Sequence, residues 1–140
     1  MKKAIIYKSR LGSTKKYAQW LKDEIGADSF KHSQLKGEKL KDYDLLVIMS
    51  GTYFGNMPMI GYLKKNWQYL ENKKVVVLAV GAAPENEEWS KKSYLKIPEQ
   101  IREKIKLYKK IRGRMAGEKD DLVRKENLKS VVDKINSFKS

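Results

Sequence analysis

The stretch K-A-I-I-Y-K-S-R-L-G-S-T, residues 3–14, decides the fold that we expect for this chain. Its first six residues place apolar and β-branched types between lysines, which is typical of a short buried strand. A polar turn follows over residues 9–12, and apolar residues then recur in steps of three and four. This spacing predicts a helix that begins near Ser13 or Thr14, where a hydroxyl group caps it, and that ends at Gly26.

The pattern of a strand followed by a helix recurs along the rest of the chain. Continuous apolar runs at residues 44–50 and 74–80 predict central strands that are covered on both faces. Residues 27–32 and 105–111 predict two weaker strands. Helices are expected over residues 58–70, 89–96 and 127–138, with a short helix after Pro98 and a loop or exposed helical turn at 33–42. This alternation implies βαβ units, so we expect an α/β fold with a parallel sheet.

Length and composition indicate one domain. The 140 residues weigh 16.3 kDa, which is the usual size of a single domain, so we expect one domain over residues 1–140. The absence of cysteine excludes disulfides, thiolate metal sites and cysteine nucleophiles, and with a single histidine we expect no transition-metal site. The longest apolar runs fall far short of the roughly 20 residues of a membrane span. We therefore expect a cytoplasmic protein with no transmembrane segment.

The chain is strongly basic, with a formal net charge of +14 at pH 7. A surface of this charge attracts phosphate groups, nucleic acids, anionic lipids or acidic proteins. The basic residues are dense over 102–114, and most of these side chains are expected to lie on a solvated face. Tyr108 is the only aromatic residue in this run, which disfavours a nucleic-acid partner. An acidic protein partner and peripheral contact with a membrane surface both stay open.

In a parallel sheet of this kind, ligands bind at the carboxyl ends of the strands, where the direction of winding reverses. The loops that matter are therefore 9–14, 51–57 and 81–89. The first combines hydroxyl groups with free backbone N–H groups at a helix N-terminus, which suits a phosphate monoester. Gly12 would let the backbone approach that group closely. The same residues also fit a plain capped helix after a turn, so both interpretations stay open.

The other two loops carry weaker signals. In G-T-Y-F-G-N-M-P, residues 51–58, Tyr53 and Phe54 stand between glycines, and an aromatic ring can stack on a flat ligand. The alternative is that these two rings only cover the core. The third loop, G-A-A-P-E-N-E-E-W, residues 81–89, places small residues near Trp89 and says little alone.

Together the three loops resemble the flavodoxin family, whose phosphate loop follows the pattern Ser/Thr-x-x-Gly-x-Thr, met here by Ser9, Gly12 and Thr14. The resemblance implies a flavodoxin-like three-layer sandwich with a five-stranded parallel sheet in the strand order 2-1-3-4-5. It also implies flavin mononucleotide (FMN) as the cofactor of an electron-transfer protein or small flavin oxidoreductase. We expect its redox partner protein to be acidic, and we predict no residue to be a catalytic acid or base.

The resemblance also implies which residues contact the cofactor. The phosphate would be held by Ser9, Arg10, Leu11, Gly12, Ser13 and Thr14. The ring would be stacked and bordered by Gly51, Thr52, Tyr53, Phe54, Gly55 and Asn56. The opposite wall would be formed by Gly81, Ala82, Ala83 and Trp89.

Longer stretches, S-R-L-G-S-T-K-K-Y-A and S-G-T-Y-F-G-N among them, are similar to the branch of the family that includes menaquinone-dependent protoporphyrinogen oxidase. This similarity implies an alternative function, an oxidase-like enzyme that passes electrons to a quinone or to another small-molecule acceptor. A second alternative is a non-catalytic flavodoxin-like module whose basic face binds an anionic partner.

Overall fold

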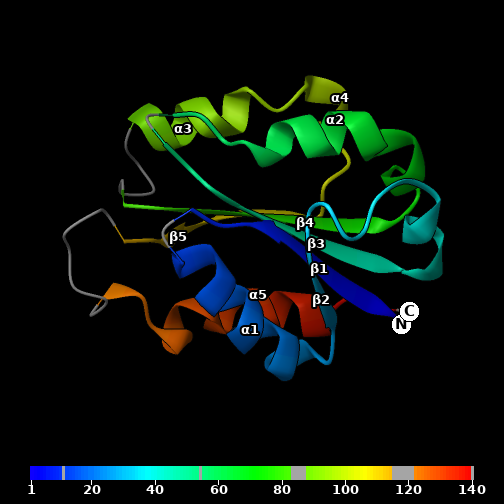
Figure 1. The fold of residues 1–140 in the computed structure, drawn as a ribbon, viewed down its shortest axis with the longest axis horizontal. Helices are drawn as coiled ribbons and strands as arrows, with labels where there is room; N and C mark the ends of the chain where they lie inside the picture. Colours follow the sequence, from blue (N-terminus) through cyan, green and yellow to red (C-terminus); the bar gives the residue numbers. More distant parts are fainter. Residues whose placement is uncertain (11, 54, 83–87, 115–121, 140) are drawn as a thin grey trace.

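A parallel sheet forms the centre of the molecule (Figure 1). The computed structural model describes residues 1–10, 12–53, 55–82, 88–114 and 122–139. The strands of the sheet are β1 (Lys3–Lys8), β2 (Asp28–Lys31), β3 (Leu45–Gly51), β4 (Lys74–Gly81) and β5 (Leu107–Arg112). Their spatial order is β2-β1-β3-β4-β5, and all neighbouring pairs are parallel. The predicted α/β fold and strand order are therefore confirmed.

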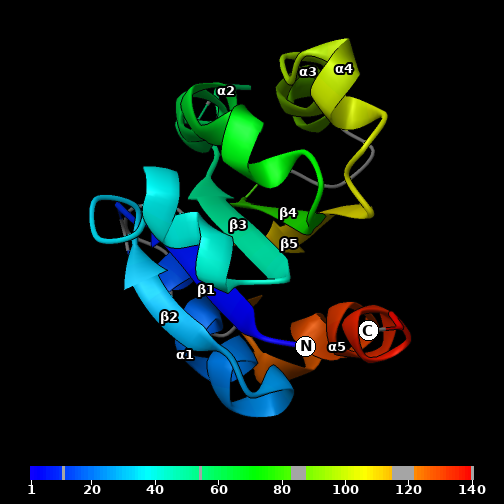
Figure 2. The same ribbon diagram turned by 90° about the vertical axis from the view of Figure 1, so that its right-hand side faces the viewer.

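Helices cover both faces of this sheet (Figure 2). They are α1 (Ser13–Ile25), α2 (Met59–Leu70), α3 (Glu88–Leu95), α4 (Glu99–Arg102) and α5 (Lys129–Asn136), with the 3₁₀-helices η1 (Gly37–Asp42) and η3 (Lys125–Leu128). On one face lie α1 and α5, and on the other lie α2, α3 and α4. This arrangement gives the predicted three layers.

The central strand β3 shows how the two layers of helices are held to the sheet. It is buried along its whole length, so alternate side chains enter two separate cores. Leu45, Val47 and Met49 pack in the core that includes α1 and α5. Leu46 and Ile48 pack in the core that includes α2 and α4. Each such side chain contributes about 1.5–3 kcal/mol when fully buried, so both cores fix the strand ends at which the predicted functional loops begin.

The C-terminal end of α1 agrees with the prediction, and the N-terminal end does not. Gly26 ends the helix in the left-handed region (φ +65°) and donates its N–H to the carbonyl of Lys22, as glycine commonly does at a helix C-terminus. At the other end, the predicted hydroxyl cap is wrong. The N-cap residue is Gly12, and no side chain caps the helix.

Candidate functional site

The loop between β1 and α1 brings backbone donors to the carboxyl edge of the sheet. Gly12 is in the left-handed region (φ +89°), and in the described part of the chain no atom beyond its chain neighbours lies within 4 Å of the position that a Cβ would occupy. Its N–H donates to Ser9 Oγ (3.1 Å), and its carbonyl accepts the N–H of Lys16 (3.0 Å). The first N–H groups of α1 precede any intrahelical acceptor, and no acidic side chain lies in that turn. Open space beside these donors suits an anion.

Ser13 and Thr14 lie where this loop enters α1, and both are buried. The Ser13 hydroxyl oxygen accepts the backbone N–H of Arg114, which follows β5, at 3.1 Å. The hydroxyl group therefore binds a distant segment and not its own helix, which explains why the predicted cap is absent. Its hydrogen can still be donated to a ligand.

The loop after β3 forms a tight turn. Tyr53 and Asn56 exchange two backbone hydrogen bonds of 2.8 and 2.9 Å. Gly55, the third residue of the turn, is in the left-handed region (φ +82°), a conformation that favours glycine. The N–H of Thr52 donates to the carbonyl of Val80 (2.9 Å), so the turn is attached to β4.

The ring of Tyr53 lies over the end of β3 and reaches the loop after β1. A Cβ at Gly51 would lie 2.4 Å from the Tyr53 hydroxyl oxygen, so only glycine leaves room for this ring. The guanidinium carbon of Arg10 lies 5.4 Å from the ring centroid, which is within the range of a cation–π contact. Burial raises the pKa of Tyr53, with the Arg10 charge acting in the opposite direction. The first and second loops therefore meet through these two side chains.

The end of β4 packs closely against the loop after β3 and the end of β5. A Cβ at Gly81 would lie 2.1 Å from Thr52 Oγ1 and 2.8 Å from Lys110 Nζ. The Gly81 carbonyl accepts the N–H of Gly113 at 2.8 Å. The residues after β1, β3 and β4 thus gather at one edge of the sheet, as predicted from their places after the strands.

Some predicted site residues fall outside what the structure describes. They are Leu11, Phe54 and Ala83. Trp89 lies in the first turn of α3, and only its backbone is described. The remaining predicted residues belong to the three loops and share one edge of the sheet. Their contact with a cofactor stays a prediction.

Basic side chains of β5 also reach these loops, although they are not among the predicted site residues. Lys110 donates to Thr52 Oγ1 (2.7 Å), and the Arg112 guanidinium donates to the carbonyl of Ala82. The expectation of a solvated basic run over 102–114 is wrong for Lys110, which is buried. Successive side chains of a strand point to opposite faces of the sheet, and helices cover both faces of a parallel sheet. This rule could have predicted that some lysines of the strand are buried.

Two lysines at the end of α3 complete a basic rim around the turn. Lys96 donates to Asn56 Oδ1, and the Lys92 side chain passes 3.0 Å from the position that a Cβ of Gly55 would occupy. Both lysines are exposed, as is Arg10 on the opposite loop. The edge at which the loops meet is therefore positively charged on two sides.

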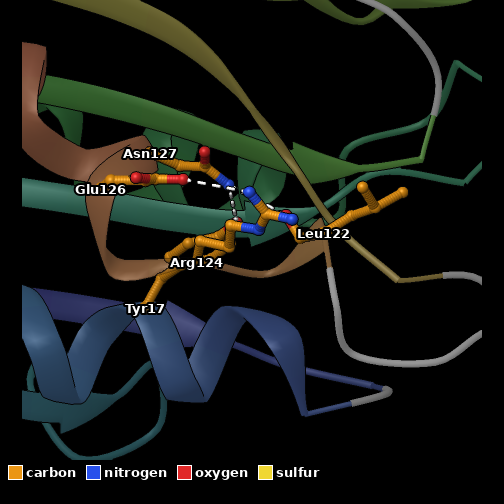
Figure 3. Close-up of polar contacts among 5 residues, drawn as sticks. All are labelled: Tyr17, Leu122, Arg124, Glu126 and Asn127. Atoms are coloured by element: carbon orange, nitrogen blue, oxygen red, sulfur yellow. Dashed lines mark hydrogen bonds and ion pairs between the residues drawn. The ribbon is translucent and has the colours of Figure 1, made fainter.

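A buried tyrosine links α1 to the end of β5 and, as Figure 3 shows, to the C-terminal segment. The Tyr17 hydroxyl donates to the carbonyl of Arg112 (2.5 Å) and accepts a hydrogen bond from the side-chain amide of Asn127 (2.9 Å). The same amide donates to the carbonyl of Leu122 (2.9 Å). Burial raises the pKa of Tyr17, which keeps the hydroxyl protonated as a donor. These bonds hold the beginning of α1, and with it the loop 9–14, against the end of β5.

Tyr17→Phe is expected to lower the free energy of unfolding by about 1–3 kcal/mol, because the Arg112 carbonyl and the Asn127 amide would lose a buried partner. Urea unfolding followed by circular dichroism measures the change. Tyr7→Phe is the matched control, since Tyr7 is half-buried in β1 and its hydroxyl bonds to none of the described residues. The control should change by less than about 0.5 kcal/mol. Equal losses in the two variants would contradict a stabilising role for the hydroxyl network.

Two further properties bear on the kind of site. Within the described ranges, no group of three or more His, Asp or Glu side chains is placed to hold a metal ion. None of the helices in that part of the chain is long and apolar enough to cross a membrane.

Comparisons with known proteins agree with this architecture. A family model described as a flavodoxin domain matches residues 4–138. No protein of the curated set matches the sequence significantly.

Solved structures of low sequence identity share the fold. A flavodoxin from the domain Archaea has a TM-score of 0.67 at 18% identity, over 97% of this chain and 95% of that chain. Oxidised Flavodoxin 2 from Bacillus cereus has a TM-score of 0.64 at 20% identity, over 99% of this chain and 100% of that chain. A flavoprotein from Lactobacillus acidophilus NCFM in complex with FMN has a TM-score of 0.58 at 19% identity, over 79% and 92% of the two chains.

Proposed function

This chain belongs to the flavodoxin domain family, and on that premise we propose that it binds FMN and carries electrons between redox partners. One observation carries the proposal. The loops after β1, β3 and β4 gather at one edge of the sheet, where open space at Gly12 lies beside the first N–H groups of α1. The Lactobacillus flavoprotein, which was solved in complex with FMN, supports the choice of cofactor.

The residues around Gly12 fit the phosphate end of FMN. Gly12 has no side chain, so a ligand can approach the backbone N–H groups at the start of α1. Ser9, Ser13 and Thr14 would add hydroxyl donors, and the exposed Arg10 would add positive charge. Each hydrogen bond to a charged phosphate contributes about 1.5–3 kcal/mol.

The loops after β3 and β4 fit the ring end of the cofactor. Neighbouring strands lie about 4.8 Å apart, and β3 separates β1 from β4, so the exits of β1 and β4 are about 10 Å apart. A ligand with its phosphate at the exit of β1 would place its other end between the two later loops. Tyr53 would stack on the ring, Gly55 and Asn56 would border one edge, and Gly81 would lie on the other side.

FMN supplies the electron-accepting ring when it is bound. The side chains and backbone of this protein bind and orient it. The donors at Gly12 would fix one end, and the Tyr53 ring with the tight turn would shield the other end from water. Burial raises the pKa of Tyr53, so its hydroxyl stays protonated and uncharged at neutral pH. We assign no residue as a catalytic acid or base.

We also propose that the redox partner presents an acidic surface to the rim formed by Arg10, Lys92 and Lys96. Opposite charges steer association at low salt, and added salt screens them, so the rate should fall as ionic strength rises. Stopped-flow reduction by an acidic and by a basic donor protein, across a salt series, measures this. An acidic donor whose rate rises or stays flat with added salt would contradict the proposed docking surface.

Titration of the purified protein with FMN tests the proposed cofactor. We expect a yellow protein that quenches the fluorescence of the flavin on binding and that releases FMN when it is denatured. A protein that stays colourless after incubation with excess FMN would contradict the proposal. That result would favour the alternative of a non-catalytic module whose basic face binds an anionic partner.

A further inference from the structure

Lys110 is a buried cation that forms no ion pair with any carboxylate in the described ranges. The residue is only 8% exposed, and its Nζ donates a hydrogen bond to Thr52 Oγ1 at 2.7 Å. Lysine is almost never buried to this extent without a charged partner, because the transfer of a charge out of water is unfavourable. The hydroxyl of Thr52 offsets only part of that unfavourable free energy.

The fold carries the Lys110 ammonium to the edge of the sheet at which the loops meet. Side chains alternate along β5, so Lys110 lies on the same face as Tyr108. The ring of Tyr94 in α3 packs 4.8 Å from that of Tyr108, centroid to centroid, so α3 covers this face. Besides bonding to Thr52, the Lys110 Nζ lies 2.8 Å from the position that a Cβ of Gly81 would occupy. The ammonium therefore lies where β3 and β4 end.

This position corresponds to the ring end of the proposed cofactor site. The loop that would hold the phosphate follows β1, whereas Lys110 joins the ends of β3 and β4 in the order β2-β1-β3-β4-β5. Burial also lowers the pKa of Lys110. A negative charge that forms nearby would oppose this effect, so the ammonium and such a charge stabilise each other.

We propose that the Lys110 ammonium stabilises the negatively charged reduced form of the bound flavin and so raises its reduction potential. The inference rests on FMN binding at the site proposed above. In the reaction concerned, an external reductant such as dithionite supplies two electrons and the solvent supplies one proton. The ring system then changes from neutral to singly negative. A nearby positive charge favours the negative product by a factor on the order of ten in the equilibrium constant.

Redox titration of the FMN-loaded protein against a reference dye, under anaerobic conditions, tests this proposal. Lys110→Met keeps the length of the side chain and removes its charge. We expect it to lower the reduction potential by about 30 mV, which is the equivalent of tenfold for a two-electron couple. Lys110→Arg keeps the charge and should retain most of the potential. Lys109→Met is the matched control, because it removes the same charge from the opposite face of β5 and should leave the potential nearly unchanged.

The dissociation constants of oxidised and reduced FMN give a second measurement. Lys110→Met should weaken the binding of reduced FMN about tenfold and leave the binding of oxidised FMN nearly unchanged. The inference would be overturned if Lys110→Met and Lys109→Met changed the reduction potential equally, or if neither changed it. Either result would leave the proposed FMN binding intact. Failure of the unmodified protein to bind FMN would overturn the proposed function and this inference together.

Thr52→Val separates the charge of Lys110 from its hydrogen bond. This variant keeps the ammonium and removes the hydroxyl acceptor, so the potential should change much less than in Lys110→Met. If Lys110→Met does not fold, Lys110→Gln removes the same charge, keeps a polar group at this position and should lower the potential in the same way. A shift in Thr52→Val as large as that expected for Lys110→Met would assign the effect to the hydrogen bond and overturn the proposal.

Discussion

Replacing Gly12 with valine is expected to weaken FMN binding by at least about a hundredfold, or about 2.7 kcal/mol. Gly12 is in the left-handed region (φ +89°), where a β-branched residue is a strained outlier. Among the described residues, no atom outside Gly12 and its chain neighbours lies within 4 Å of the Cβ position, so we expect no clash with them. The valine would instead turn the backbone, re-aim the N–H groups at the start of α1 and fill the space beside them.

Gly37→Val is the matched control for this substitution. Gly37 is also in the left-handed region (φ +62°), and its Cβ position is equally open, but it begins η1 and lies outside the three loops. Both variants should lose about 1–3 kcal/mol of stability from backbone strain. Only Gly12→Val should lose affinity for FMN in calorimetric titration. Normal FMN binding by a folded Gly12→Val protein would place the phosphate away from this loop.

Riboflavin, which lacks the phosphate, is expected to bind about 10²- to 10⁴-fold more weakly than FMN. Two hydrogen bonds to a charged phosphate, at about 1.5–3 kcal/mol each, account for this range. Calorimetric titrations with FMN, flavin-adenine dinucleotide and riboflavin measure the differences, and FMN should bind most tightly. In Gly12→Val the affinity for riboflavin should change much less than that for FMN. Equal affinities of FMN and riboflavin for the unmodified protein would contradict the phosphate assignment.

The elements of the fold could be predicted because their signals are local. A central parallel strand is covered on both faces and needs a continuous apolar run, so the predictions at 44–50 and 74–80 agree with β3 and β4 to within one residue. The helix over 58–70 agrees with α2 in the same way. The order of the strands is not a local property. Alternation alone leaves several orders open, and the flavodoxin resemblance supplied the one that the structure confirms.

The candidate site was predictable as a set of loops but not as a set of contacts. The rule that ligands bind at the carboxyl ends of parallel strands selected one edge of the sheet, where the described loop residues do meet. Ligand binding at this edge stays a prediction. Lys110 donates to Thr52, and the Ser13 hydroxyl accepts the backbone N–H of Arg114. In both contacts the two residues are far apart in the sequence. In the sequence Lys110 is one lysine of a basic run, and only its packing under α3 distinguishes it from the exposed Lys104 and Lys106 of that run.

During translation, the contact that secures α1 forms late. Tyr17 and Asn127 are 110 residues apart, so the Tyr17 hydroxyl gains both of its partners only after the ribosome has added those 110 residues. At about 5–20 residues per second, this delay is roughly 5 to 20 s. Throughout that time the loop 9–14 lacks the bonds that hold it against β5. The nascent polypeptide thus contains the residues of the proposed phosphate site well before the bonds that hold their arrangement can form.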